Sequence, residues 1–303
     1  MSALSDTGLP PQAEDIAAGA AELVACGSLE MGTDSPDLVP RIAELLPAGT
    51  PVYVNHLPRR LLGESLPVLT ALAKAGLEPV PHVAARRIAS PAEAETFLQQ
   101  AVRQAGVRKV LLIGGDMAEP VGPYADSAGL LKERLLPDCG IVQVGLAGYP
   151  EGHPRIATER LSAALDDKLA LAEAQGISAY ILTQFSFAPM RIVEYCAAMA
   201  RRAPHVAIYV GMAGPTSPRT LIRYAHRCGV SASLLALQAQ GMGAVRLFTH
   251  VDPTDQLTTF ARHAQSGSTR NVVGVHLYAF GGVVAAAAWM NARIIARASA
   301  AGR

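Results

Sequence analysis

The sequence has few of the features that mark several classes of protein. Only 17% of its 303 residues are charged, the formal net charge is +1, and aromatic residues make up 5%. So small an excess of charge gives no electrostatic indication of a nucleic-acid partner. The four cysteines form no CxxC pair and no Cys/His cluster at zinc spacing; they are Cys26, Cys139, Cys196 and Cys228. We therefore expect reduced, buried thiols and no metal site.

Targeting signals and long apolar runs are also missing. The segment 1–15 is polar and then rich in alanine, unlike a secretory signal. The run 283–298 is apolar, but it is short and is interrupted by Asn291 and Arg293, which is typical of a final packed helix and not of a membrane span. No GxGxxG motif follows a strand. These features predict a cytoplasmic enzyme that acts on a small molecule, with no membrane partner.

Apolar, β-rich runs recur eight times in a chain that is half hydrophobic. They cover 24–31, 52–57, 78–85, 109–116, 141–150, 179–187, 205–214 and 272–280. Stretches rich in alanine and leucine lie between them, and strands that alternate with helices pair in parallel. Eight such units predict an α/β protein with a closed (β/α)8 TIM barrel.

The length fits a single barrel domain over residues 1–303. Residues 1–20 are expected to form an N-terminal extension and helix, and 231–270 to add extra helices before the last strand. The segment 90–106 is predicted as a helix, with Ser90 as its cap, Pro91 in its first turn and Gly106 at its end.

Two details of this prediction concern single residues. Cys26 is expected inside the first strand, as a core residue. The basic pairs Arg86-Arg87 and Arg201-Arg202 are expected at solvated helix or loop positions, with phosphate binding as the less favoured alternative.

Polar residues stand at or near the ends of several predicted strands, where a barrel of this type has its active site. They are Glu30, Asn55, His82, Asp116, Tyr149 and Gln184. Glu30 ends an otherwise apolar strand, and a poorly hydrated barrel mouth would raise the pKa of its carboxyl group. Such a group is a general acid or base near neutral pH. The alternative is a salt-bridged or solvated carboxylate.

Each of the other strand-end residues also allows two interpretations, one functional and one structural. Asp116 follows two glycines that would let a ligand approach the backbone, or it caps an ordinary turn. The Gln184 amide offers donors and an acceptor to the edge of a heterocycle, or it is satisfied inside the barrel. Tyr149 and His153 share a short loop that is either part of a site or a turn shaped by proline.

Five segments, taken in order, resemble the methylenetetrahydrofolate reductase family. They are SLE (28–30), PH (81–82), GGD (114–116) followed by GPYADSAGLL (122–131), GYPEGHP (148–154) and TQFSF (183–187). The resemblance extends roughly from Gly27 to Ala292, and YPEGHP and TQFSF are its most specific parts. It implies a (β/α)8 barrel that reduces 5,10-methylenetetrahydrofolate to 5-methyltetrahydrofolate, or catalyses the reverse, with hydride passing from NAD(P)H to FAD and then to the folate.

The resemblance also implies roles for individual residues. Glu30 matches the family's proton donor, whose proton opens the five-membered ring and leaves an electrophilic iminium. Asp116 matches the aspartate that hydrogen-bonds the pterin near the flavin, and Gln184 matches a glutamine at the pterin edge. Tyr224 matches an aromatic residue beside the stacked substrate or nicotinamide. The positions that match the flavin site are Asn55, His82, Gly115, Tyr124, Ala125, Tyr149 and His153.

The sequence departs from the family pattern where a diphosphate would need positive charge. Gly114 stands in place of the arginine of an RGD motif, and Leu171 and Ala172 stand in place of a basic pair, with only Lys168 nearby. The arginine expected after the last strand falls within 279–282, which is AFGG. Two hypotheses follow: FAD binds through altered contacts, or NADH passes its hydride directly to the folate.

Other functions on the same barrel remain open at this stage. A folate-dependent methyltransferase would keep the pterin contacts without a nicotinamide. A non-catalytic folate-binding protein would not need Glu30. Exposed apolar helix faces would be compatible with a homo-oligomer.

Overall fold

Eight parallel strands close into a barrel in chain order, as the sequence predicts. The computed structural model describes residues 13–56, 60–228, 230 and 252–301. The strands are β1 (Ser28–Met31), β2 (Pro51–Val54), β3 (Glu78–Ala84), β4 (Lys109–Ile113), β5 (Gln143–Gly148), β6 (Ser178–Thr183), β7 (Ala207–Ala213) and β8 (Val272–Tyr278). β8 pairs in parallel with β1, where Ser28 lies opposite His276, and this pairing closes the sheet.

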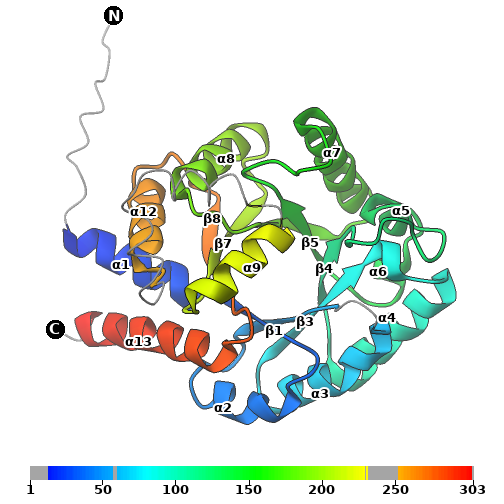
Figure 1. The fold of residues 1–303 in the computed structure, drawn as a ribbon, viewed down its shortest axis with the longest axis horizontal. Coiled ribbons are helices and arrows are strands. Elements are labelled where there is room, and N and C mark those ends of the chain that lie inside the picture. The colour runs from blue at the N-terminus through cyan, green and yellow to red at the C-terminus, as the bar shows by residue number, and fades with distance from the viewer. Residues whose placement is uncertain (1–12, 57–59, 229, 231–251, 302–303) are drawn as a thin grey trace, which may run out of the picture.

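Helices surround the barrel (Figure 1). They are α1 (Ala13–Ala25), α2 (Val39–Ala43), α3 (Leu66–Lys74), α4 (Pro91–Ala105), α5 (Ser127–Lys132), α6 (Leu135–Asp138), α7 (Thr158–Ala174), α8 (Pro189–Arg202), α9 (Pro218–Cys228), α12 (Thr254–Gln265) and α13 (Val283–Ala301). Short 3-10 turns are η1 (Pro36–Leu38), η2 (Leu62–Ser65) and η3 (Ala85–Arg87). Among the described residues, no helix has both the length and the hydrophobicity of a membrane span.

The extra helices predicted before the last strand are confirmed in part. α12 forms within the predicted segment and packs against α1 and α8. The first of the extra segments, 232–241, lies outside the described residues. The N-terminal helix, predicted within 1–20, runs from Ala13 to Ala25.

The prediction for the start of the first strand is wrong. Val24 belongs to α1 and is buried there as a helix residue, whereas Cys26 is exposed in the turn that follows. Helical bonding continues past the end of α1, since the Cys26 amide donates to the Glu22 carbonyl. A Cβ on Gly27 would lie 2.8 Å from the carbonyl oxygens of Val24 and Val275, so the turn needs glycine to pass between them. The apolar run therefore joins two elements, and β1 has only four residues.

The signals read for the helix over 90–106 are confirmed. The Ser90 side chain accepts a hydrogen bond from the Glu93 amide, and Pro91 opens α4. Gly106 ends the helix in the left-handed conformation, with φ 60°. Each feature satisfies or removes a backbone group that a helix end leaves without a partner.

The strands divide the apolar side chains between two cores. Residues such as Leu29, Val52 and Val54 point outward and pack in one large core with the helices. A second core fills the barrel interior; its buried members are Tyr53, Val80, Leu111, Tyr180 and Leu182. This alternation follows from the two-residue period of a strand. It decides which polar residues point into the barrel.

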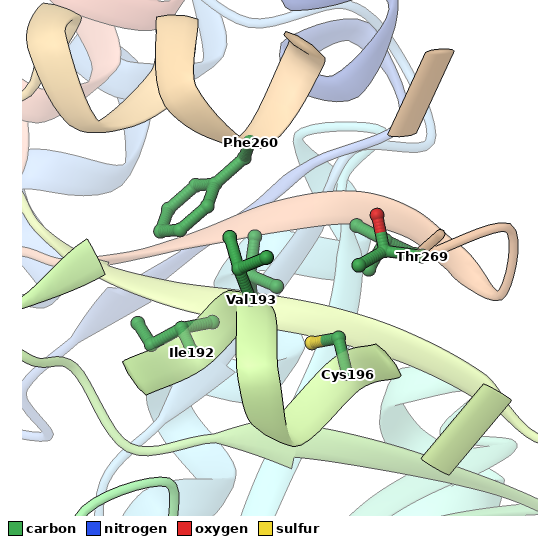
Figure 2. A pocket seen from close by; sticks show the side chains of 7 residues that line it. Ile192, Val193, Cys196, Phe260 and Thr269 are labelled. Atoms are coloured by element: carbon green, nitrogen blue, oxygen red, sulfur yellow. The ribbon is translucent and has the colours of Figure 1, made fainter. Parts of the chain in front are cut away.

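Phe260 packs α12 against the outer layer of helices. Figure 2 shows the phenyl ring extending from α12 toward Ile192, Val193 and Cys196 of α8, with Thr269 at the edge. The space that remains is an apolar cavity of only about 10 Å³. That volume is close to the minimum for one water molecule, so the contact is a packed interface and not a ligand site.

We expect Phe260→Ala to lower the free energy of unfolding by about 3–5 kcal/mol, because it enlarges this cavity and removes buried aromatic area. Arg262→Ala, at an exposed position of the same helix, is the control and should change it by less than about 0.5 kcal/mol. Urea unfolding measures both values. A loss of under 1 kcal/mol for Phe260→Ala would show that α12 does not support the barrel.

Candidate functional site

Glu30 points into the barrel and is nearly excluded from water. It is the third residue of β1, opposite Tyr53 of β2, and its side chain is 12% exposed. Burial raises the pKa of its carboxyl group to about 7, although a hydrogen bond from the Asn55 side chain acts in the opposite direction. Desolvation disfavours the charged form, which is the effect expected for a poorly hydrated barrel mouth. Glu30 is therefore neither a solvated carboxylate nor one held ionised by a basic partner.

His82 of β3 is the nearest ionisable neighbour of Glu30. Its Nε2 atom lies 3.8 Å from a Glu30 carboxyl oxygen. That distance alone would allow an ion pair, but burial and the nearby His56 lower the pKa of His82 to about 3. The imidazole is therefore neutral at pH 7 and exerts no net charge that would ionise Glu30.

Two further polar side chains lie on the N-terminal side of Glu30 in the barrel and were not predicted from the sequence. Ser28 and His276 share a hydrogen bond of 2.8 Å between Oγ and Nδ1, in a fully buried position. The Tyr53 ring packs edge-on against both His276 and His82, with centroids 4.7 and 6.0 Å apart. Burial lowers the pKa of His276 well below its usual value, so this layer is polar but uncharged. The alternation of His276 and Tyr278 in the last strand was the signal that could have identified it.

The Arg86-Arg87 pair is not solvated as predicted. Arg86 donates three hydrogen bonds to carbonyl groups of the β4–α5 loop, those of Met117, Ala118 and Ala125. The Arg87 side chain is only 9% exposed; it forms an ion pair with Asp116 and donates to the His56 carbonyl. The prediction failed because the partners lie 29 to 39 residues away along the chain, in the loops that follow β2 and β4.

Asp116 stands in the loop after β4, with its side chain 55% exposed. Gly115 before it has a φ of 92°, a conformation that favours glycine, and a Cβ at this position would lie 3.4 Å from the Ala84 side chain. The Arg86 amide donates to the Gly114 carbonyl over 2.9 Å, which joins this loop to η3. Gly115 thus lets the β4 loop lie close against the end of β3, whereas a Cβ at Gly114 would meet nothing within 4 Å.

A groove with a volume of about 990 Å³ opens beside this loop. Its walls come from the β4–α5 and β5–α7 loops and from α7 and α8. Ala125 and Tyr149, both predicted for the flavin site, line it together with Gly114 and Lys168. The volume lies at the upper end of the range for ligand pockets.

The groove carries an excess of positive charge. Five basic side chains line it, Arg86, Arg160, Lys168, Arg191 and Arg202, against three acidic ones, Asp126, Glu151 and Glu194. Several are engaged, since Arg202 pairs with Asp166 and Arg191 with Glu194. Arg160 and Lys168 form no ion pair within the described part of the chain. Burial lowers the pKa of Lys168, partly offset by Asp126, and an anion would stabilise its charged form.

Aromatic side chains gather at the ends of β6 and β8, beneath α9. Tyr224 of α9 stacks on Phe280 at a centroid distance of 4.5 Å, and Phe185 packs edge-on against Phe280 at 5.1 Å. Phe280 has a φ of 48°, which is unusual for a side chain of this size. Such strain recurs at functional sites, where the surroundings hold it in place. Gln184 directly follows β6, and its backbone N–H group donates a hydrogen bond to the Gly148 carbonyl of the neighbouring strand.

Outside the loop after β4, where Gly115 and Asp116 lie, the predicted residues fall into three groups, with one exception. Glu30, Asn55 and His82 come together in what we call the acid cluster. Ala125 and Tyr149 line the groove, and the ring of His153 packs edge-on against that of Tyr149 at 5.5 Å. Gln184 and Tyr224 lie on the side of β6–β8.

Tyr124 is the exception. It is 2% exposed in the outer core, and its hydroxyl donates to the Glu133 carboxylate, so it does not line the groove. Within the described residues, no group of three or more His, Cys, Asp and Glu side chains is arranged to hold a metal ion.

No protein-family model matches the chain. Among solved structures, it is similar to a Yersinia pestis DHPS with a pterine-sulfa conjugate, at 13% identity and a TM-score of 0.48, over 88% of this chain and 92% of that one. It is also similar to a 3-dehydroquinate dehydratase from Geobacillus kaustophilus, at 13% identity and a TM-score of 0.39, over 62% of this chain and 74% of that one. Both similarities are at the level of the fold, which the chain's own closed sheet establishes.

The raised pKa of Glu30 predicts a stability difference that depends on pH. The folded state holds this proton up to about pH 7, whereas the unfolded chain releases it near pH 4.5. The stabilisation is therefore complete below pH 4.5 and is lost as the pH rises through 7. We expect Glu30→Gln, which cannot ionise, to gain about 2–3 kcal/mol over the wild type between pH 5 and pH 8. Urea unfolding at several pH values tests this, and a constant difference would contradict it.

Proposed function

We propose that this chain is an oxidoreductase that reduces 5,10-methylenetetrahydrofolate to 5-methyltetrahydrofolate with NAD(P)H, or catalyses the reverse, with Glu30 as the proton donor. The observation that carries the proposal is a carboxyl group with a pKa of about 7, buried near the end of β1 beside an uncharged imidazole. A group of this kind is half protonated at neutral pH. It can therefore give up a proton in one direction and accept it in the other.

The proton has a defined task in this reaction. Glu30 protonates the leaving nitrogen of the five-membered ring, the bond from that nitrogen to the methylene carbon breaks, and an iminium forms at the other nitrogen. A hydride then adds to the methylene carbon, so one proton and one hydride convert the methylene bridge into a methyl group. Asn55 orients the Glu30 carboxyl group by its hydrogen bond. The low solvent exposure of Glu30 limits the access of bulk water to the iminium.

The remaining strand-end residues fit the binding of a reduced pterin. The Asp116 carboxylate would accept hydrogen bonds from ring N–H groups, and the Gln184 amide can both donate and accept. The stacked pair of Tyr224 and Phe280 provides a flat apolar surface for an aromatic ring of the substrate. Holding two flat rings in contact is the geometric requirement of hydride transfer.

The groove fits FAD as the cofactor. Its volume suits a dinucleotide, Tyr149 and Ala125 line it, and Arg160 and Lys168 would face the diphosphate from α7. FAD bound there would carry hydride between NAD(P)H and the folate. The family pattern has a basic pair where Leu171 and Ala172 stand in this chain. Lys168 lies near these positions, so the positive charge on α7 is lower than in the family pattern but not lost.

The role of Glu30 is tested by measuring the rate of NADH oxidation in the presence of methylenetetrahydrofolate and the absence of oxygen. The flavin content of the protein is assayed beforehand. We expect Glu30→Gln to lower kcat by about 10²–10⁴-fold while folate binding is retained, because only proton transfer is removed. In the wild type, kcat should fall tenfold per pH unit above about 7, as Glu30 loses its proton. Glu95→Gln, on the exposed face of α4, is the control. Unchanged turnover in Glu30→Gln would overturn the assignment.

The cofactor site is tested separately by titration with FAD. We expect Lys168→Ala to weaken FAD binding about tenfold to hundredfold, because a charge-assisted hydrogen bond to phosphate contributes about 1.5–3 kcal/mol. Lys132→Ala, at an exposed position of α5, should leave the affinity unchanged. A colourless wild-type protein that oxidises NADH with the folate and does not bind FAD would instead support direct hydride transfer.

A further inference from the structure

Two adjacent arginines join the end of β3 to the loop after β4. Arg86 donates to carbonyl groups near both ends of the segment 117–125, and the Val121 amide in its middle donates to the Arg86 carbonyl over 2.9 Å. A Cβ on Gly122 would lie 2.3 Å from the Ala89 carbonyl oxygen, so this loop lies directly on the β3–α4 connection. The loop is long and rich in glycine and proline, yet it is attached to η3 at several points.

Arg87 attaches the same loop by a different route. One of its terminal nitrogens donates to the Asp116 carboxylate and the other donates to the His56 carbonyl. His56 follows Asn55, whose side chain hydrogen bonds to Glu30. A continuous series of contacts therefore runs from the Glu30 carboxyl group through the end of β2 to Asp116.

Exposure within the Arg87–Asp116 pair is strongly unequal. The arginine is 9% exposed and the aspartate 55%. The guanidinium is thus buried on the protein side of the ion pair, whereas the Asp116 carboxylate is exposed to solvent. The Arg87 Nε atom is buried and has no hydrogen-bond partner among the described residues. A buried N–H group without an acceptor is unfavourable, so this arrangement is not explained by the needs of folding alone.

We propose that Arg87 is a positioning residue that fixes the Asp116 carboxylate relative to Glu30 by bridging it to the His56 carbonyl. The proposal rests on the proposed function in that Asp116 is taken as a ligand of the pterin. A guanidinium offers several donors in one plane and can hold two acceptors at a fixed separation. An ammonium group at the same place keeps the charge but is a compact point donor on a flexible stem, so it would hold Asp116 less firmly.

The test compares Arg87→Lys, Asp116→Asn and the double variant. We expect Arg87→Lys to lower kcat by about 10–100-fold, since a displacement of about 1 Å of a positioned group has an effect of that order. The Michaelis constant for NADH and the fall of kcat above about pH 7, which report on other residues, should not change. The double variant should be no slower than the slower single variant, because both changes break the same contact. Arg103→Lys, on the exposed face of α4, is the matched control.

Hydrogen exchange provides a readout that does not depend on activity. We expect Arg87→Lys to speed amide exchange at 114–116, where Asp116 is held, and to leave 117–125, which Arg86 holds, near the wild-type rate. Losses of kcat that multiply in the double variant, or unchanged exchange at 114–116, would overturn the positioning role. If the wild-type protein lacks reductase activity, the proposed function fails, and the exchange comparison alone decides whether Arg87 holds the loop.

Discussion

The burial of one carboxyl group against an uncharged imidazole is the constraint on which the site depends. Leu29 and Met31 point outward into the main core, so the two-residue period of β1 places Glu30 in the barrel interior. A register shift of one residue would exchange these environments and place the acid in the apolar layer between the strands and the helices. Fold and chemistry are therefore coupled: the same exclusion of water that raises the pKa of Glu30 makes its ionised form unfavourable for folding. The neutral state of His82 preserves this balance, because a protonated imidazole 3.8 Å away would lower that pKa again.

The end of β3 connects the acid cluster to the groove. His82 lies within β3 and faces Glu30, and Arg86 and Arg87 lie two and three residues after the end of this strand. Arg86 lines the groove, whereas Arg87 contacts the backbone of the β2 loop. One short segment thus contributes both to the buried surroundings of Glu30 and to the positively charged groove. The proposed hydride transfer needs two flat molecules in a fixed relation, and a common support for both places would limit their relative movement.

Local signals in the sequence predict more of this structure than signals between distant residues. The eight strands, the caps of α4 and the polar residues at the strand ends depend on neighbours within a few positions, and the structure has them. The contacts of Arg87 lie 29 and 31 residues away, and Ser28 and His276 are 248 residues apart, so only the closed sheet brings them together. Cys26 was misplaced for a different reason: an apolar run at a helix end is indistinguishable from the start of a strand by periodicity alone. The groove could not be predicted at all, since no single segment forms it.

The position of Arg87 also bears on the missing arginine at Gly114. Residues at the same level of adjacent parallel strands are about 5 Å apart, so a side chain from either strand can reach the same point. Ala84 pairs with Ile113, and the Arg86 amide hydrogen bonds to the Gly114 carbonyl, which places η3 beside the GGD segment. A guanidinium absent from the β4 loop is therefore supplied to Asp116 from the end of β3. Because the substituting residue lies on another strand, comparison of the motif position by position detects only the loss. Asp116 therefore has a guanidinium beside it although Gly114 carries no side chain.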